Sequence, residues 1–329
     1  MAPPRVPPAG QEARVVQTGG VPVSPSNTVL AYAPRTGILG PSADRRLAQV
    51  TGGNGTPQAC NPGSNFWLQA GKGKENEVLF RHIDFTKLAE GTYYTFRVKR
   101  PGHPLPEQVA IFLVPSTLER AYEIQTDLKN YGKVVPGMFF SQADPRSDFT
   151  YHMWATNLGV PGIADGFKAR TKNTEFVSDD ESYSKVSFVY VDGDFGSLIV
   201  APTLKLLNIQ SNNGSWENHA CKGQKMTVVV YRILLYPNLV QLGQRVDRST
   251  DKPAKYYEDK ARDYMETAEA VVNFFGKYAL DFTIKNFVSL AELGPAWSPT
   301  PDITPKPLAE DPKWSSTAKK MEAEPVDLD

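Results

Sequence analysis

Short apolar runs separated by turn residues are the feature that most constrains the fold of this chain. The run TYYTFRVKR (92–100) alternates, so aromatic and aliphatic residues fall on one face of a strand and basic residues on the other. The run QVAIFLV (108–114) is continuously apolar, which is typical of a strand buried on both faces. Seven further runs have a similar character: EVLFRHID (77–84), KVVPGMFF (133–140), FTYHMWA (149–155), KVSFVYV (185–191), SLIVAP (197–202), LKLLNI (204–209) and KMTVVVYRILLY (225–236).

These runs predict a mainly β domain of antiparallel strands over residues 66–245, built as a β-sandwich of the jelly-roll kind. Arg97 and Lys99 lie on the polar side of their strand and are expected to face solvent. A contact between these two residues and nucleic acid stays open but is not favoured, because their strand separates them from its aromatic residues. The predicted core residues are Tyr94, Phe96, Val98, Ile111, Leu113, Val186, Phe188, Val228 and Val230.

Two segments have helical patterns instead. Ser116 and Glu119 have the spacing of a capping box, and Gly132 stands where a helix would end. The second pattern, over residues 257–275, predicts an amphipathic helix packed on the β domain. A coiled-coil seam is the alternative, and the mixed charges on its polar side argue against an anionic membrane surface. Its apolar stripe consists of Tyr257, Ala261, Tyr264, Ala268, Val271 and Phe275.

Both ends of the chain are rich in proline, which opposes regular structure. Ten prolines occur within residues 1–65, and the last 35 residues have the same character. We therefore expect an extended arm (1–65), a β-sandwich body (66–245), a helical segment (246–294) and an extended tail (295–329). Both ends keep apolar residues that would be unfavourable in water, so they are expected to bind a partner surface. The candidate interaction residues are Val29, Leu30, Tyr32, Ile38 and Leu39 in the arm, and Trp297, Ile303, Leu308 and Trp314 in the tail.

Charge and cysteine content limit the possible partners and compartment. With 36 basic and 36 acidic residues, the formal net charge is zero, which disfavours the coating of nucleic acid as a main task. Cys60 and Cys221 allow one disulfide, but two distant cysteines are easier to explain in a reducing compartment. We expect neither a secretory signal nor a membrane span, because no apolar stretch has the length that either requires.

The sequence contains no motif that predicts catalysis, a cofactor or a metal. No two of the four histidines have a metal-ligand spacing, and AGKGKE (70–75) lacks the spacing of a phosphate-binding loop. VDGDFG (191–196) is better explained as a hairpin turn than as a calcium loop. We therefore predict no catalytic, cofactor-binding or metal-binding residues and no enzymatic activity. An enzyme whose site is assembled from distant residues is a further alternative.

An extended arm, a β-rich body, a helical addition and an extended tail together resemble a viral capsid or other virion structural protein. The resemblance lies in this layout, and no motif carries it. It implies a capsid, minor capsid or cement subunit in a virion, present in the host cytoplasm during assembly. Its partners would be copies of itself or other structural proteins. The alternative is a cellular β-sandwich that serves as a scaffold or binding module in a multiprotein complex.

Overall fold

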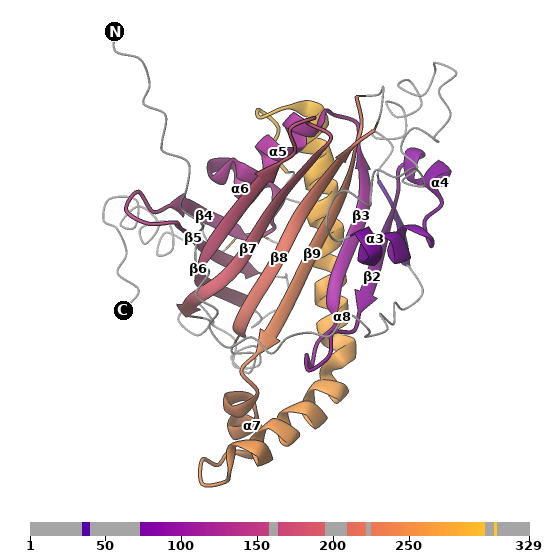
Figure 1. The fold of residues 1–329 in the computed structure, drawn as a ribbon. Coiled ribbons are helices and arrows are strands. Elements are labelled where there is room, and N and C mark those ends of the chain that lie inside the picture. Colours follow the sequence, from indigo (N-terminus) through magenta and orange to yellow (C-terminus); the bar gives the residue numbers. More distant parts are fainter. Residues whose placement is uncertain are drawn as a thin grey trace, which may run out of the picture.

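The centre of the molecule is one antiparallel sheet with a long helix, α8 (Ala254–Leu293), lying across one of its faces (Figure 1). The computed structural model describes residues 35–39, 73–157, 164–194, 209–221, 225–299 and 306–307. Of the ten strands in the described residues, nine have the order β1-β2-β3-β9-β8-β7-β6-β5-β10, and the tenth, β4, pairs with β5. They are β1 (Arg35–Ile38), β2 (Thr92–Val98), β3 (Glu107–Val114), β4 (Met138–Ala143), β5 (Phe149–Asn157), β6 (Ala164–Val177), β7 (Tyr183–Asp194), β8 (Ile209–Ala220), β9 (Thr227–Pro237) and β10 (Lys306–Pro307).

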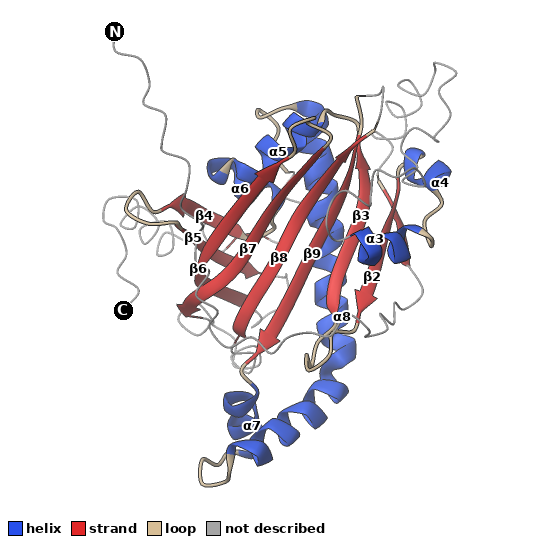
Figure 2. Ribbon diagram, in the orientation of Figure 1, coloured by secondary structure: helices blue, strands red, loops and turns tan. Residues whose placement is uncertain are grey.

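Helices lie on both faces of the sheet (Figure 2). We call the face that contacts α8 the inner face and the opposite one, which α3 contacts, the outer face. The described helices other than α8 are α3 (Gly73–Phe80), α4 (Phe85–Ala89), α5 (Leu118–Thr126), the 3-10 turn η2 (Leu128–Asn130), α6 (Tyr131–Val134) and α7 (Leu239–Asp247). Within the described residues, no helix combines the length and apolar character that crossing a membrane requires.

A stack of aromatic rings joins α8 to the inner face. Trp216 of β8 is fully buried, and its ring centroid lies 3.8 Å from that of Tyr231 and 5.3 Å from that of Phe287. Phe112 of β3 meets Phe287 edge-on at 5.6 Å. Such ring pairs stabilise a fold beyond the area that they bury. This stack fixes the C-terminal part of α8 against β3, β8 and β9.

The predicted core residues are confirmed, with one partial exception. Eight of the nine are buried, and Phe188 is half-buried and packs against the core. The predicted helix over 257–275 is also confirmed as part of α8, in which Tyr257 and Ala261 are buried and Tyr264 is half-buried. The side chains of Ala268, Val271 and Phe275 lie outside the described residues.

The prediction of a jelly-roll sandwich is wrong. A sandwich packs two sheets against each other, whereas here the inner face of a single sheet packs on α8. The chain is mainly β and antiparallel, as predicted, but its second layer is helical. The helical segment is therefore not an addition to a closed body, because Leu280, Ile284 and Phe287 belong to the same core as the strands.

Several local predictions also need correction. EVLFRHID contributes to α3, and KVVPGMFF is divided between the end of α6 and β4. The predicted helix at 116 starts from Thr117, whose hydroxyl accepts from the backbone N–H of Arg120, and it ends at Thr126. Asp192 and Gly193, predicted to form a turn, lie within β7. SLIVAP and most of LKLLNI lie outside the described residues.

Two pieces of the proline-rich ends form edge strands, contrary to the expectation that these ends have no regular structure. Residues 35–38 pair with β2, and residues 306–307 pair with β5. Leu39 is only 2% exposed and belongs to the core of its own chain. Trp297 packs against the same core. The side chain of Ile38 is not described, and Val29, Leu30, Tyr32, Ile303, Leu308 and Trp314 lie outside the described residues.

Cys221, which directly follows β8, is disulfide-bonded. The other cysteine of the chain, Cys60, lies outside the described residues. A disulfide at Cys221 goes against the reducing compartment that the cysteine content favours.

Candidate functional site

The inner face changes character between its two halves. Along β3, β8 and β9 it carries the aromatic rings that pack on α8. The pairing register extends this face to β6, because Trp216 is opposite Val186, and Phe188, two residues further along β7, is opposite Asn173. Alternate residues of a strand share a face, so Asn173 faces the same side of the sheet as Trp216.

Five neutral polar side chains, which we call the polar row, form a hydrogen-bonded chain on this part of the inner face. Ser141 Oγ lies 2.9 Å from His152 Nδ1, and His152 Nε2 lies 3.0 Å from Thr171 Oγ1. The Thr171 hydroxyl donates to Asn173 Oδ1 at 3.1 Å, and the Asn173 amide donates to Thr150 Oγ1 at 3.3 Å. Three members, His152, Thr171 and Thr150, are buried, whereas Ser141 and Asn173 are half-buried.

The directions of these bonds fix the state of the histidine. Because the Thr171 hydroxyl donates to Asn173, its oxygen is left to accept from Nε2–H of His152. Nδ1 then accepts from the hydroxyl of Ser141. Burial lowers the pKa of His152 to about 3, so the imidazole is neutral at physiological pH. The polar row therefore carries no charge.

Tyr131 of α6 connects the polar row to the aromatic half of the inner face. Its hydroxyl accepts from Trp216 Nε1 at 2.9 Å, and its ring centroid lies 6.2 Å from that of His152. Burial raises the pKa of Tyr131 to about 12, against the opposing effect of the Trp216 hydrogen bond. The inner face thus joins a neutral hydrogen-bonding strip to a wall of aromatic rings.

The outer face carries a different kind of polar group. We call the side chains of Arg100, Glu107, Lys185, Glu217 and Arg232 the outer ion cluster. Glu217 Oε1 lies 3.0 Å from Lys185 Nζ and 3.8 Å from Arg232 Nε, while Arg232 Nη1 lies 3.3 Å from Glu107 Oε2. Arg100 also pairs with Glu107. Two carboxylates are thus each shared between two cations beneath α3.

Asn76 ties α3 to this cluster. Its amide donates to Glu217 Oε2 at 2.9 Å, and its oxygen accepts from Arg232. Burial alone would raise the pKa of Glu217, but Lys185 and Arg232 outweigh it, and the net shift is downward. The carboxylate is therefore charged in the folded protein. The cluster has the geometry of a satisfied structural network, which holds α3 on the sheet.

His219 borders the outer ion cluster. Its ring packs against Tyr183 at 4.9 Å and edge-on against Phe80 at 6.4 Å. Burial lowers the pKa of His219 to about 3, although Glu217 opposes the shift. Burial raises the pKa of Tyr183, and the charge of Glu217 raises it further. Neither group changes its charge near neutral pH, which does not suit a general acid or base.

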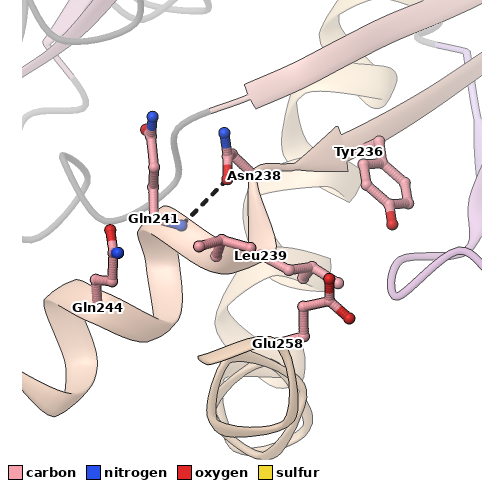
Figure 3. A pocket seen from close by; sticks show the side chains of 7 residues that line it. Tyr236, Asn238, Leu239, Gln241, Gln244 and Glu258 are labelled. Carbon is pink, nitrogen blue, oxygen red and sulfur yellow. Dashed lines mark hydrogen bonds between the residues drawn. The ribbon is translucent and has the colours of Figure 1, made fainter. Parts of the chain in front are cut away.

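An open cleft of about 940 Å³ lies away from both faces, where β9 leads into α7 (Figure 3). It is bounded by the end of β9, the first turns of α7 and the start of α8. No group of three His, Cys, Asp or Glu side chains that could hold a metal ion occurs in the described parts of the chain.

The polar row and the outer ion cluster were both missed by sequence reasoning, and the predicted interaction residues belong to neither. Arg97, expected in solvent, is half-buried on the inner face, while Lys99 is exposed. One signal could have revealed part of the polar row. In GFKARTKN, which belongs to β6, neutral and basic residues alternate with the period of a strand.

Solved structures with a related arrangement are known, although no protein-family model and no curated protein matches the chain. Human StAR-related lipid transfer protein 5 is 10% identical, with 69% of this chain and 97% of that chain covered and a TM-score of 0.40. The lipid transfer and protein localization domain of human StarD13 is 9% identical, with 60% of this chain and 82% of that chain covered and a TM-score of 0.37. The Zhui aromatase/cyclase from Streptomyces sp. R1128 is 13% identical, with 57% of this chain and 98% of that chain covered and a TM-score of 0.34.

The fold overturns the prediction of a virion structural protein, together with its location in a virion. The prediction depended on a sandwich body with arms that reach a neighbour. The body is instead a sheet wrapped on a helix, and the described pieces of both arms pair with strands of their own chain.

Proposed function

We propose that this protein is a binding module for a small neutral lipophile that carries a hydroxyl or carbonyl group. The ligand would lie on the inner face, between the sheet and α8. Its apolar part would contact the aromatic side chains near Tyr131, and its polar group would meet the polar row.

The observation that supports this proposal is the uncharged polar row beside the aromatic wall. Small-molecule sites are mostly apolar, with a few placed polar groups that orient the ligand. The row uses one N–H of Asn173 and the hydroxyl proton of Ser141. An amide has a second N–H donor and a hydroxyl oxygen has acceptor positions, so both half-buried side chains can bond to a ligand. Without a cation in the row, an anionic headgroup would be disfavoured.

The same geometry supports binding rather than catalysis. Ser141 and His152 are in hydrogen-bond contact, as a nucleophile and its base would be. A useful base needs a pKa near the working pH, however, and burial lowers that of His152 to about 3. The other imidazole nitrogen meets the hydroxyl of Thr171 rather than a carboxylate.

Equilibrium binding of a fluorescent sterol tests the proposal. Dehydroergosterol is neutral and has one hydroxyl group, whereas oleate has a similar apolar area and a carboxylate. We expect saturable binding of the sterol, detected by energy transfer from tryptophan, and at least tenfold weaker binding of oleate. Equal affinity for both ligands, or no saturable binding of the sterol, would contradict the proposal.

Two variants locate the site. Ser141→Ala and Asn173→Ala each remove one polar group from the row, and we expect each to raise the Kd for the sterol about three- to tenfold, the usual value of one hydrogen bond. Ser187→Ala is the matched control, because Ser187 is half-buried and lies on the outer face. The control should leave the Kd unchanged. An equal effect of all three variants would show that the sterol binds elsewhere.

A further inference from the structure

The cleft between β9, α7 and α8 is separate from the inner face and has its own chemistry. After β9 the chain enters α7, which packs on the first turns of α8 and forms a helical hairpin that projects past the end of the sheet (Figure 1). The volume of about 940 Å³ lies in the range of small-molecule sites. The residues that line it share no member with the polar row, so an inference from this cleft goes beyond the proposed function.

The polar lining consists of three amides, a phenol and a carboxylate: Asn238, Gln241, Gln244, Tyr236 and Glu258. Amides both donate and accept hydrogen bonds, and a carboxylate accepts them. No cation is among the residues that line the cleft, and one carboxylate is, so an anion would be disfavoured. A hydroxyl group also both donates and accepts, which matches this set. The aromatic ring adds an apolar surface for the C–H groups of a sugar ring.

We propose that this cleft binds a neutral saccharide. Figure 3 shows the side chains of Asn238, Gln241 and Gln244 at the start and along the first turns of α7, and Glu258 on the adjoining α8. The cleft therefore offers polar groups from two helices. A polyhydroxyl ring offers donors and acceptors in several directions, and this arrangement can satisfy them without a net change of charge.

The walls of the cleft are held in place by contacts outside it. Asn238 caps α7, because its side-chain oxygen accepts from the backbone N–H of Gln241 at 3.1 Å. Tyr236 packs edge-on against the ring of His103 at 5.2 Å. A Cβ atom at Gly243 would collide with the backbone of Tyr257, so glycine allows the close approach of α7 and α8. A site whose walls are already positioned loses less entropy when it binds a ligand.

Saturation-transfer difference NMR on the full chain tests the proposal, with maltose, cellobiose, lactose and N,N′-diacetylchitobiose as probes. We expect at least one of these sugars to show saturable transfer, with a Kd in the millimolar range or tighter. Gln244→Ala and Glu258→Ala should each weaken that binding at least fivefold. Absence of saturable transfer from all four sugars would overturn the proposal.

Asp259→Ala is the matched control for Glu258→Ala. The two acids are neighbours in α8, but Asp259 is exposed and pairs with Lys255, and it does not line the cleft. The control should bind the sugar as the unaltered chain does. Equal losses in both variants would place the sugar elsewhere and overturn the proposal.

Gln241→Ala provides a second test, on an exposed residue, and the affinity of this variant for the sugar should also fall. Dehydroergosterol binding should persist in every cleft variant, so failure of this site is distinguishable from failure of the inner-face site.

Discussion

Single residues of the outer ion cluster are sensitive because their charges are buried. The side chains of Glu217 and Arg232 are only 2% and 7% exposed, and each touches more than one partner. The ion pair of Arg170 with Asp192 is of the same kind but lies at the surface, with exposed fractions of 26% and 40%. A buried charge that loses its partner is costly, whereas a surface pair contributes little. Removing the carboxylate charge should therefore lower the free energy of unfolding much more at Glu217 than at Asp192.

Glu217→Gln should lower the free energy of unfolding by about 3–5 kcal/mol, because Lys185 would lose the carboxylate that it contacts and the buried Arg232 would keep only Glu107. Asp192→Asn, the matched surface change, should lower it by less than about 1 kcal/mol. Urea unfolding followed by circular dichroism measures both. Equal losses in the two variants would show that the outer ion cluster is not buried in solution.

The buried histidines predict an acid-sensitive fold. Burial lowers the pKa of His152 and of His219 from 6.5 to about 3. The unfolded chain therefore takes up protons below about pH 6.5 that the folded chain does not bind, and stability falls as the pH decreases toward 3. Between pH 6.5 and 5 we expect a loss of at most about 1.4 kcal/mol per pH unit for each histidine. In His152→Gln the free energy of unfolding should depend on pH about half as steeply between pH 6.5 and 5. An unchanged dependence would contradict the lowered pKa of His152.

At the scale of elements, the two ends of the chain close the edges of the sheet. β1 pairs with β2 at one edge, and β10 pairs with the end of β5, next to β4, at the other. An uncovered edge presents unpaired N–H and C=O groups to other chains, so short pairing segments reduce the risk of aggregation. Apolar residues next to such segments then dock on the same molecule. Leu39 does so directly after β1, where its backbone N–H donates to the carbonyl of Gly91 at 2.9 Å.

Leu39→Ala should lower the free energy of unfolding by about 2–5 kcal/mol, since it removes a buried side chain and leaves a cavity. Leu293→Ala is the control, because Leu293 is 50% exposed, and its effect should stay below about 0.5 kcal/mol. Denaturant titration of both variants makes the comparison. If Leu39→Ala were as stable as the control, docking of the arm on its own body would be refuted.

Element prediction succeeded where a strand was apolar on one face or on both faces. β2 and β9 were found because their alternating or continuous apolar residues are buried. β8 was missed because its sequence, IQSNNGSWENHA, puts polar side chains on both faces, where Glu217 and Asn218 are satisfied by residues distant in sequence. α3 was mistaken for a strand because a short apolar run fits either element.

At the scale of the whole molecule, the second layer could not be predicted from strand patterns alone. The apolar stripe of residues 257–275 indicated a packed helix, but it did not show that the helix, 40 residues and about 60 Å long, would replace a second sheet. The polar row escaped prediction for a similar reason. Its members come from β4, β5 and β6, and only the pairing register brings Ser141, His152 and Thr171 together.

Photo-crosslinking with a diazirine-bearing sterol tests the central claim, that a neutral lipophile binds the inner face, most directly. After irradiation of the full chain and proteolysis, mass spectrometry identifies the modified peptides. The account predicts that modification falls on peptides of β4, β5, β6 or α6, near the polar row and Tyr131, and that excess unlabelled sterol suppresses it. Modification confined to the α7–α8 hairpin or to peptides of α3 and α4, or modification that excess sterol does not suppress, would contradict the account.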